Sequence, residues 1–234
     1  MDITDTLFDT LFLDVETIPP RTGAVLERVR AAIQPPAQYK KPESIAAWMA
    51  ENADAAAAEQ VSKLGLDGLY GELVVIGFAI GGGAPVIGQA TNGDERALIQ
   101  RFFEMVEEFA TKRADGASND LQIVGHNVEF DLRFILHRAV KHALAIPPSL
   151  RRAFHPEKGR YHTFDTMRMW AGWKGYVKLR DLDRELFGIE GEDIDGKDVA
   201  ATWASDPQKV MDHCAMDIER TRRVFCALAV TLGL

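Results

Sequence analysis

Short apolar runs alternate along this chain with longer segments that carry helical periodicity. Apolar runs bounded by turn residues predict strands, and they lie at 11–17, 72–80, 86–90, 121–124 and 162–164. Apolar residues three and four positions apart predict helices, and the most regular lie at 23–33, 42–63, 94–112, 129–136, 179–187 and 207–231. This order of elements predicts an α/β fold with a mixed sheet flanked by helices.

The glycine run at 81–83 follows the second predicted strand and precedes the third. Glycine loops that bind phosphate lead from a strand into a helix. A strand on both sides instead favours the turn of a hairpin. We therefore interpret this run as structural.

An alanine-rich segment at 42–63 lies between the first two predicted strands. Its composition favours a helix, although Asn52, Ala53 and Asp54 predict an interruption. We interpret the segment as part of a helical insertion at about 34–66 within a single domain that spans residues 1–234.

Composition indicates an ordinary globular protein. The chain has 234 residues, of which 47% are hydrophobic and 26% charged, so it is long enough to bury a core. No apolar run reaches the roughly 20 residues of a membrane span, and the acidic N-terminus does not resemble a secretory signal. Cys214 and Cys226 lie about 18 Å apart in one predicted helix, which excludes a disulfide between them. We therefore expect a cytoplasmic protein with no membrane association.

The net charge of −8 argues against a nucleic-acid partner, but the charge is unevenly distributed. Segment 147–180 contains eight basic and two acidic residues, so its net charge is +6 and that of the remainder is −14. Aromatic residues are interleaved with the basic ones, among them Phe154, Tyr161, Trp170, Trp173 and Tyr176. Basic side chains with interleaved aromatic rings are typical of single-strand nucleic-acid binding. A solvated surface with partly buried aromatic rings is the alternative.

The first predicted strand ends in two acids separated by one residue. Side chains alternate across a strand, so Asp14 and Glu16 face the same way while Val15 enters the core. Carboxylates roughly 6 to 7 Å apart on one face repel each other unless a cation lies between them. Hard divalent cations prefer such oxygen ligands. An acidic strand end in solvent is the alternative interpretation.

Further acids are expected at the same place. Asp131 lies early in the helix that follows a buried strand, where a parallel neighbour of the first strand would deliver it. His213 and Asp217 are four residues apart in the last helix and therefore share a face. Four acids from three elements are thus candidates to surround a pair of divalent ions.

These residues resemble the DEDD superfamily of 3'-5' exonucleases, and within it the proofreading exonuclease domain of family B DNA polymerases. Residues 12–17 (FLDVET) are similar to its first motif, 125–131 (GHNVEFD) to its second and 213–217 (HCAMD) to its third. The similarity in order and spacing extends from about 11 to 225. It implies a ribonuclease H-like fold with a five-stranded mixed sheet, in a stand-alone form. It also implies metal-dependent hydrolysis of phosphodiester bonds at the 3' end of single-stranded DNA.

The position of the histidine departs from this superfamily. Its members carry either a tyrosine four residues before the last aspartate or a histidine five residues before it. Here His213 lies in the tyrosine register of Asp217, and Asp212 occupies the histidine register. The sequence therefore leaves the subclass open.

The resemblance also implies a ligand set. Two divalent ions, Mg²⁺ or Mn²⁺, would be bound by Asp14, Glu16, Asp131 and Asp217, and they would activate a water and stabilise the departing 3'-oxygen. The ordinary histidine pKa near 6.5 suits His213 as the acceptor of the water's proton. A capping or surface role for His213 is the alternative.

Residues beside the motifs are candidates to contact the substrate. We expect Asn127 to contact the terminal nucleotide, and Lys178 with Arg180 to contact its phosphates. Asp165 either assists the site or caps the helix that follows it. An exoribonuclease acting on short RNA or RNA ends, and a non-catalytic single-strand binding module, are the alternative functions. A polymerase or a repair protein acting in trans is compatible as a partner.

Overall fold

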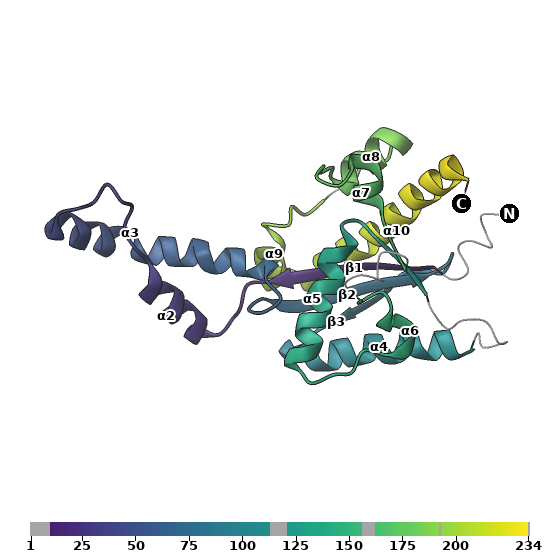
Figure 1. The fold of residues 1–234 in the computed structure, drawn as a ribbon, viewed down its shortest axis with the longest axis horizontal. Helices are drawn as coiled ribbons and strands as arrows, with labels where there is room; N and C mark the ends of the chain where they lie inside the picture. Colours follow the sequence, from purple (N-terminus) through teal and green to yellow (C-terminus); the bar gives the residue numbers. More distant parts are fainter. Residues whose placement is uncertain (1–9, 113–120, 156–161, 192, 234) are drawn as a thin grey trace. The chain divides into compact units, whose positions relative to one another are not determined.

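The computed structural model describes residues 10–112, 121–155, 162–191 and 193–233 (Figure 1). Its centre is a five-stranded sheet in the order β3-β2-β1-β4-β5. The strands are β1 (Thr10–Ile18), β2 (Glu72–Ile80), β3 (Val86–Gln89), β4 (Gln122–Gly125) and β5 (Thr163–Asp165). The β1/β4 and β4/β5 pairs are parallel and the β2/β3 pair is antiparallel. The predicted mixed sheet flanked by helices is therefore confirmed, as is the hairpin across the glycine run.

Five of the six predicted helices begin and end within one residue of the predicted positions, whereas the helix predicted at 129–136 extends to Lys141. The helices of the described residues are α2 (Gly23–Ala32), α3 (Pro42–Lys63), α4 (Glu95–Lys112), α5 (Val128–Lys141), α6 (Pro148–Arg151), α7 (Thr166–Ala171), α8 (Leu179–Phe187), α9 (Val199–Ser205) and α10 (Pro207–Leu232). Asp94 and Asp206 cap α4 and α10, because their Oδ1 atoms accept hydrogen bonds from Ala97 N and Lys209 N. None of the helices in the described ranges is both long enough and apolar enough to cross a membrane.

The central strand β1 packs differently on its two faces. Leu11, Leu13 and Val15 belong to a large core formed with α4 and α5. On the other face, the ring of Phe12 lies 5.6 Å from that of Phe225 on α10. Figure 1 shows α4 and α10 on opposite sides of the sheet. The two-residue period of a strand therefore directs every second β1 side chain toward α10.

The chain forms two compact units, of which one is Thr17–Glu72 and the other contains the rest of the described residues. Within Thr17–Glu72, α2 and α3 enclose a small core of Ile33, Ala53 and Ala57. This unit includes α2, which precedes the predicted insertion at 34–66 and packs on α3. The predicted interruption near Asn52 is wrong. Helix α3 is continuous there, and Asn52 Nδ2 donates a 3.1 Å hydrogen bond to Trp48 O within the helix.

A buried ion pair joins α4, α5 and the start of β2. Arg138 donates two hydrogen bonds to Glu95, of 2.7 and 2.6 Å, and Leu73 N donates a third of 2.7 Å. His142 Nε2 lies 2.7 Å from the same carboxylate. Burial alone would raise the pKa of Glu95, but the hydrogen bonds from Arg138 and His142 lower it below its ordinary value. The ionised carboxylate therefore stabilises the face of the sheet that lies opposite α10.

Gly77 of β2 lies where α10 approaches the sheet. A Cβ atom at this position would be 2.5 Å from Cys214 Sγ and 3.0 Å from Ile87 Cδ1. Both distances are shorter than ordinary van der Waals contact. The absence of a side chain at Gly77 therefore lets α10 pack close to the sheet at the residue that follows His213.

We predict that Gly77→Ala lowers the free energy of unfolding by about 1 to 3 kcal/mol, because the added methyl group overpacks this contact. Urea denaturation would measure the change. Gly82→Ala is the matched control, since a Cβ there meets no atom within 4 Å. Adding Cys214→Ala should recover part of the loss by removing the closer of the two contacts. Equal destabilisation by Gly77→Ala with and without Cys214→Ala would contradict this account.

Candidate active site

The C-terminal end of β1 carries the first two acids of the site. Asp14 and Glu16 share the strand face of Phe12, which is directed toward α10. Parallel pairing of β1 with β4 brings the start of α5 to the same end of the sheet. Val15 N donates a 3.0 Å hydrogen bond to Asp131 Oδ1, which ties α5 directly to β1. Three carboxylates from two elements therefore meet at this strand end.

Helix α10 brings two more of the expected residues to this place. His213 is buried, and its Nε2 atom lies 3.6 Å from Glu16 Oε1 and 3.7 Å from Asp217 Oδ2. The neighbouring Cys214 Sγ donates to Asp14 O at 3.7 Å. The fold therefore gathers Asp14, Glu16, Asp131, His213 and Asp217 together, while their roles in catalysis stay a prediction.

Ionisation of the carboxyl groups at the end of β1 is strongly disfavoured. Burial, reinforced by the charge of Asp217, raises the pKa of Asp14 to about 8. Burial and the charge of Asp14 also raise the pKa values of Glu16 and Asp131 well above their ordinary range. Asp14 Oδ2 is buried and accepts no hydrogen bond from the described residues. An unpartnered oxygen among mutually repelling acids fits a site for divalent cations.

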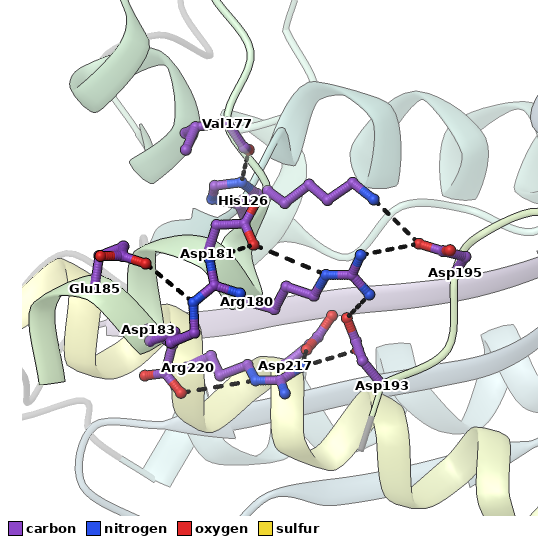
Figure 2. Close-up of polar contacts among 12 residues, drawn as sticks. His126, Val177, Arg180, Asp181, Asp183, Glu185, Asp193, Asp195, Asp217 and Arg220 are labelled. Carbon is purple, nitrogen blue, oxygen red and sulfur yellow. Dashed lines mark hydrogen bonds and ion pairs between the residues drawn. The ribbon is translucent and has the colours of Figure 1, made fainter. Parts of the chain in front are cut away.

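Asp217 has a cationic neighbour of its own. Arg220 NH1 donates hydrogen bonds to Asp217 Oδ1 at 2.7 Å and to Asp193 Oδ1 at 3.1 Å (Figure 2). Burial raises the pKa of Asp217, although His213 and Arg220 act in the opposite direction. This part of the site therefore has partial charge compensation from the protein itself.

Asp193 is a site residue that the sequence did not reveal. It lies between α8 and α9, and its Oδ1 atom is 3.1 Å from His213 Nδ1. Potential ligand atoms of Asp193, His213 and Asp217 all lie within 4.8 Å of one another. In sequence, Asp193 is one of several acids in a glycine-punctuated loop, which is typical of a solvated surface. No spacing rule relates this loop to α10, so only the folded chain brings them together.

The predicted substrate-contacting residues lie close by, but they have protein partners. Lys178 Nζ lies 3.1 Å from Asp195 Oδ1, and Arg180 NH1 lies 3.0 Å from Asp193 Oδ2 (Figure 2). Asn127 precedes α5 in a left-handed conformation with φ 66°. Their contact with a substrate stays a prediction.

Asp165 has a capping role at the start of α7. Its Oδ1 atom accepts hydrogen bonds from Met167 N and Arg168 N, at 3.0 and 3.1 Å. The same oxygen accepts a 3.0 Å hydrogen bond from Asn127 N. The predicted cap is therefore confirmed, and it joins α7 to the start of α5 beside Asp131.

The raised carboxyl pKa values predict that the metal-free protein loses stability as the pH rises. A carboxyl group with a raised pKa binds more protons in the folded state than in the unfolded state. Its stabilising contribution to the free energy of unfolding is therefore fully present below pH 4. This contribution is lost as the pH rises through the folded-state pKa, which is about 8 for Asp14. Each such group contributes at most about 1.4 kcal/mol per pH unit to this decline. Urea unfolding between pH 5 and 8 with EDTA would measure it.

Divalent cations should reverse this loss. Mg²⁺ or Mn²⁺ at 100 times its dissociation constant would stabilise the folded state by about 2.7 kcal/mol at pH 8. Asp14→Asn should weaken both the pH slope and the stabilisation by metal. Asp212→Asn is the matched control, since Asp212 is exposed on α10. A stability that depends on neither pH nor metal would contradict the assignment of a cation site.

Comparison with known proteins places the site in a family. A family model described as "Predicted 3'-5' exonuclease related to the exonuclease domain of PolB" matches residues 85–233, which is more than half of the chain. The match includes Asp131, His213 and Asp217, whereas Asp14 and Glu16 precede it. No curated protein matches the chain. With the mixed sheet and the acids at its edge, this match shows that the chain belongs to the family of predicted 3'-5' exonucleases related to the exonuclease domain of PolB.

Proposed function

We propose that this exonuclease removes nucleotides from the 3' end of single-stranded DNA and uses two divalent cations. The observation that carries the proposal is the group of carboxylates at the end of β1. They repel one another, and a buried oxygen of Asp14 has no hydrogen-bond partner among the described residues. Carboxyl groups gathered in this way are stable in their ionised form only beside a cation.

Four carboxylates would bind the cations, which we propose to be Mg²⁺ or Mn²⁺: Asp14, Glu16, Asp131 and Asp217. When bound, such ions supply an activated water and stabilise charge on the departing oxygen. His213 Nε2 lies beside Glu16 and Asp217, so it is close to any water held there and would accept its proton. Arg220 compensates part of the charge of Asp217, which favours the ionised carboxylate needed for binding.

An exposed aromatic surface supports a single-stranded substrate. Trp170 lies in the last turn of α7, and Trp173 and Tyr176 follow the helix; these residues are 49%, 78% and 74% exposed. The guanidinium carbon of Arg168 lies 4.8 Å from the ring centroid of Trp173. Helix α7 starts at Asp165, which binds the backbone of Asn127 next to the carboxylates. The unpaired bases of a strand that extends from the site over this surface would stack on these rings.

Phe154 lies away from the proposed strand-binding surface. It is only partly exposed and packs against the core on the α4 and α5 side of the sheet. The other expected residue, Tyr161, lies outside the described residues. Within the described part of the chain, the proposed strand-binding surface consists of Trp170, Trp173 and Tyr176.

The principal test is degradation of a 5'-labelled single-stranded DNA, with the RNA of the same sequence in parallel. We expect a ladder that shortens from the 3' end only when Mg²⁺ or Mn²⁺ is present. Asp14→Ala should lower the rate at least about a thousandfold, because it removes a metal ligand. Asp212→Asn is the matched control, and its rate should equal that of the wild type.

Each result of this assay has a different consequence. Faster cleavage of the RNA would identify an exoribonuclease. Binding of either strand without cleavage would contradict the proposed hydrolysis and indicate a single-strand binding module.

The aromatic surface makes a separate prediction about affinity. Trp173→Ala should weaken binding of a single-stranded 12-mer by about 10- to 100-fold, since stacking contributes about 1 to 3 kcal/mol per base. Trp173→Phe should retain most of the affinity because it keeps a ring. Val230→Ala, at a side chain that is 70% exposed near the end of α10, controls for the loss of apolar surface. Fluorescence anisotropy would measure all four proteins, and equal affinities would remove Trp173 from the binding surface.

A further inference from the structure

We propose that Asp193 positions His213 for the reaction, and that Arg180 and Arg220 hold Asp193 in place. Asp193 thereby directs the proton of the imidazole to Nδ1 and leaves the Nε2 lone pair facing the carboxylates. This inference rests on the proposed function, because it concerns the orientation of the residue that would accept the proton.

The first observation is the position of His213 Nδ1. This atom is buried and has no hydrogen bond among the described residues, yet Asp193 Oδ1 lies only 3.1 Å away. Buried polar atoms rarely lack partners, because an unsatisfied group costs about 1 to 3 kcal/mol. An imidazole N–H aligned with this oxygen would satisfy the buried nitrogen. Asp193 is therefore an acceptor for a proton on Nδ1.

The second observation is the position of the other ring nitrogen. Nε2 lies between Glu16 Oε1 and Asp217 Oδ2, at 3.6 and 3.7 Å. In a neutral imidazole one nitrogen donates and the other accepts. A proton fixed on Nδ1 by Asp193 leaves Nε2 as the acceptor. The accepting nitrogen then faces the acids that would bind the cations and the water.

The third observation is that two guanidinium groups hold Asp193 from different sides. Arg220 NH1 donates to its Oδ1 at 3.1 Å, and Arg180 NH1 donates to its Oδ2 at 3.0 Å. Arg220 is itself fixed, because Asp183 lies 3.7 Å from its Nε atom and also accepts two hydrogen bonds from Arg223. Figure 2 shows Arg180 and Arg220 on either side of Asp193. Asp193 is thus anchored to both α8 and α10.

The same guanidinium of Arg220 also contacts Asp217. Its NH1 atom lies 2.7 Å from Asp217 Oδ1 and 3.1 Å from Asp193 Oδ1. One cation therefore sets the positions of the two acids that lie on either side of the His213 ring. A metal ion bound jointly by Asp193, His213 and Asp217 would compete with Arg220 for both acids, so the geometry favours positioning over coordination by Asp193.

Arg180 has a proposed role besides the contact with a substrate phosphate that the sequence predicts. In addition to its contact with Asp193, its NH2 atom lies 3.4 Å from Asp195 Oδ1. We assign Arg180 as a positioning residue that acts through Asp193 and His213. A substrate phosphate would compete with these two acids for the N–H groups of Arg180.

The test is the tautomer of His213 in metal-free protein. Nitrogen-15 NMR of protein labelled at histidine distinguishes protonated from unprotonated ring nitrogens, at a pH high enough for the ring to be neutral. Loss of one set of signals in His213→Gln assigns them. We expect a single tautomer with the proton on Nδ1 in the wild type and a mixture in Asp193→Ala. Asp193→Asn should restore the wild-type tautomer, because its amide oxygen can accept the same hydrogen bond.

Asp195→Ala is the matched control, since Asp195 lies in the same loop and pairs with Lys178 and Arg180. It should leave the His213 signals unchanged. An Asp193→Ala protein with the wild-type tautomer would overturn the proposal. So would an equal change in the Asp195→Ala protein, because the effect would then come from the loop as a whole.

Kinetics provide the second readout. In Asp193→Ala we expect kcat to fall by about 10- to 100-fold, the range found for residues that orient a functional side chain. KM and the stabilisation by Mg²⁺ should change less than about twofold. A large loss of metal stabilisation with an unchanged tautomer would identify Asp193 as a ligand and overturn the proposal. If the wild type cleaves no strand while the tautomer still responds to Asp193, the proposed function fails and the positioning of His213 stands.

Discussion

Mutual repulsion among buried carboxylates is the constraint on which this site depends. Asp14, Glu16 and Asp131 meet where β1 ends, and burial makes each of them resist ionisation. A protein that concentrates acids in this way loses stability as they ionise, unless a cation is present. The rest of the fold provides the rigidity that keeps these groups together despite the repulsion.

That rigidity comes from both faces of the sheet. On one face, Glu95 and Arg138 form a buried ion pair that joins α4 and α5 beneath the large apolar core. On the other face, α10 packs on β1 through Phe12 and Phe225 and approaches β2 at Gly77. Helix α10 carries His213 and Asp217, so its distance from the sheet also sets their distance from the β1 acids. Packing and the geometry of the candidate site therefore depend on the same contacts.

The positive charges near the site lie on Arg220 and Arg180. Arg220 contacts Asp217 and Asp193 together, and Arg180 contacts Asp193 from α8. These cations compensate the acids around His213. Among the described residues, no lysine or arginine side chain forms an ion pair with Asp14, Glu16 or Asp131. The acids around His213 are therefore compensated by the protein's own cations, whereas the acids at the end of β1 are suited to bind added cations.

Local patterns in the sequence determined much of this protein. Strand alternation placed Asp14 and Glu16 on one face, and helical spacing placed His213 and Asp217 together. The order of strands and helices likewise predicted the mixed sheet. Each of these features depends on residues that are neighbours in sequence, so a period of two or 3.6 residues suffices to find them.

Only the tertiary structure decided which distant charges meet. It brought Asp193 to His213 and Arg220, and it paired Lys178 and Arg180 with acids of the same loop. It also kept α3 continuous and joined it with α2 in the unit Thr17–Glu72. Such contacts depend on where a loop returns in space, and no local spacing encodes that path. The strand and helices that carry the predicted metal ligands were therefore readable from the sequence, while the charged groups around His213 became visible only in the folded chain.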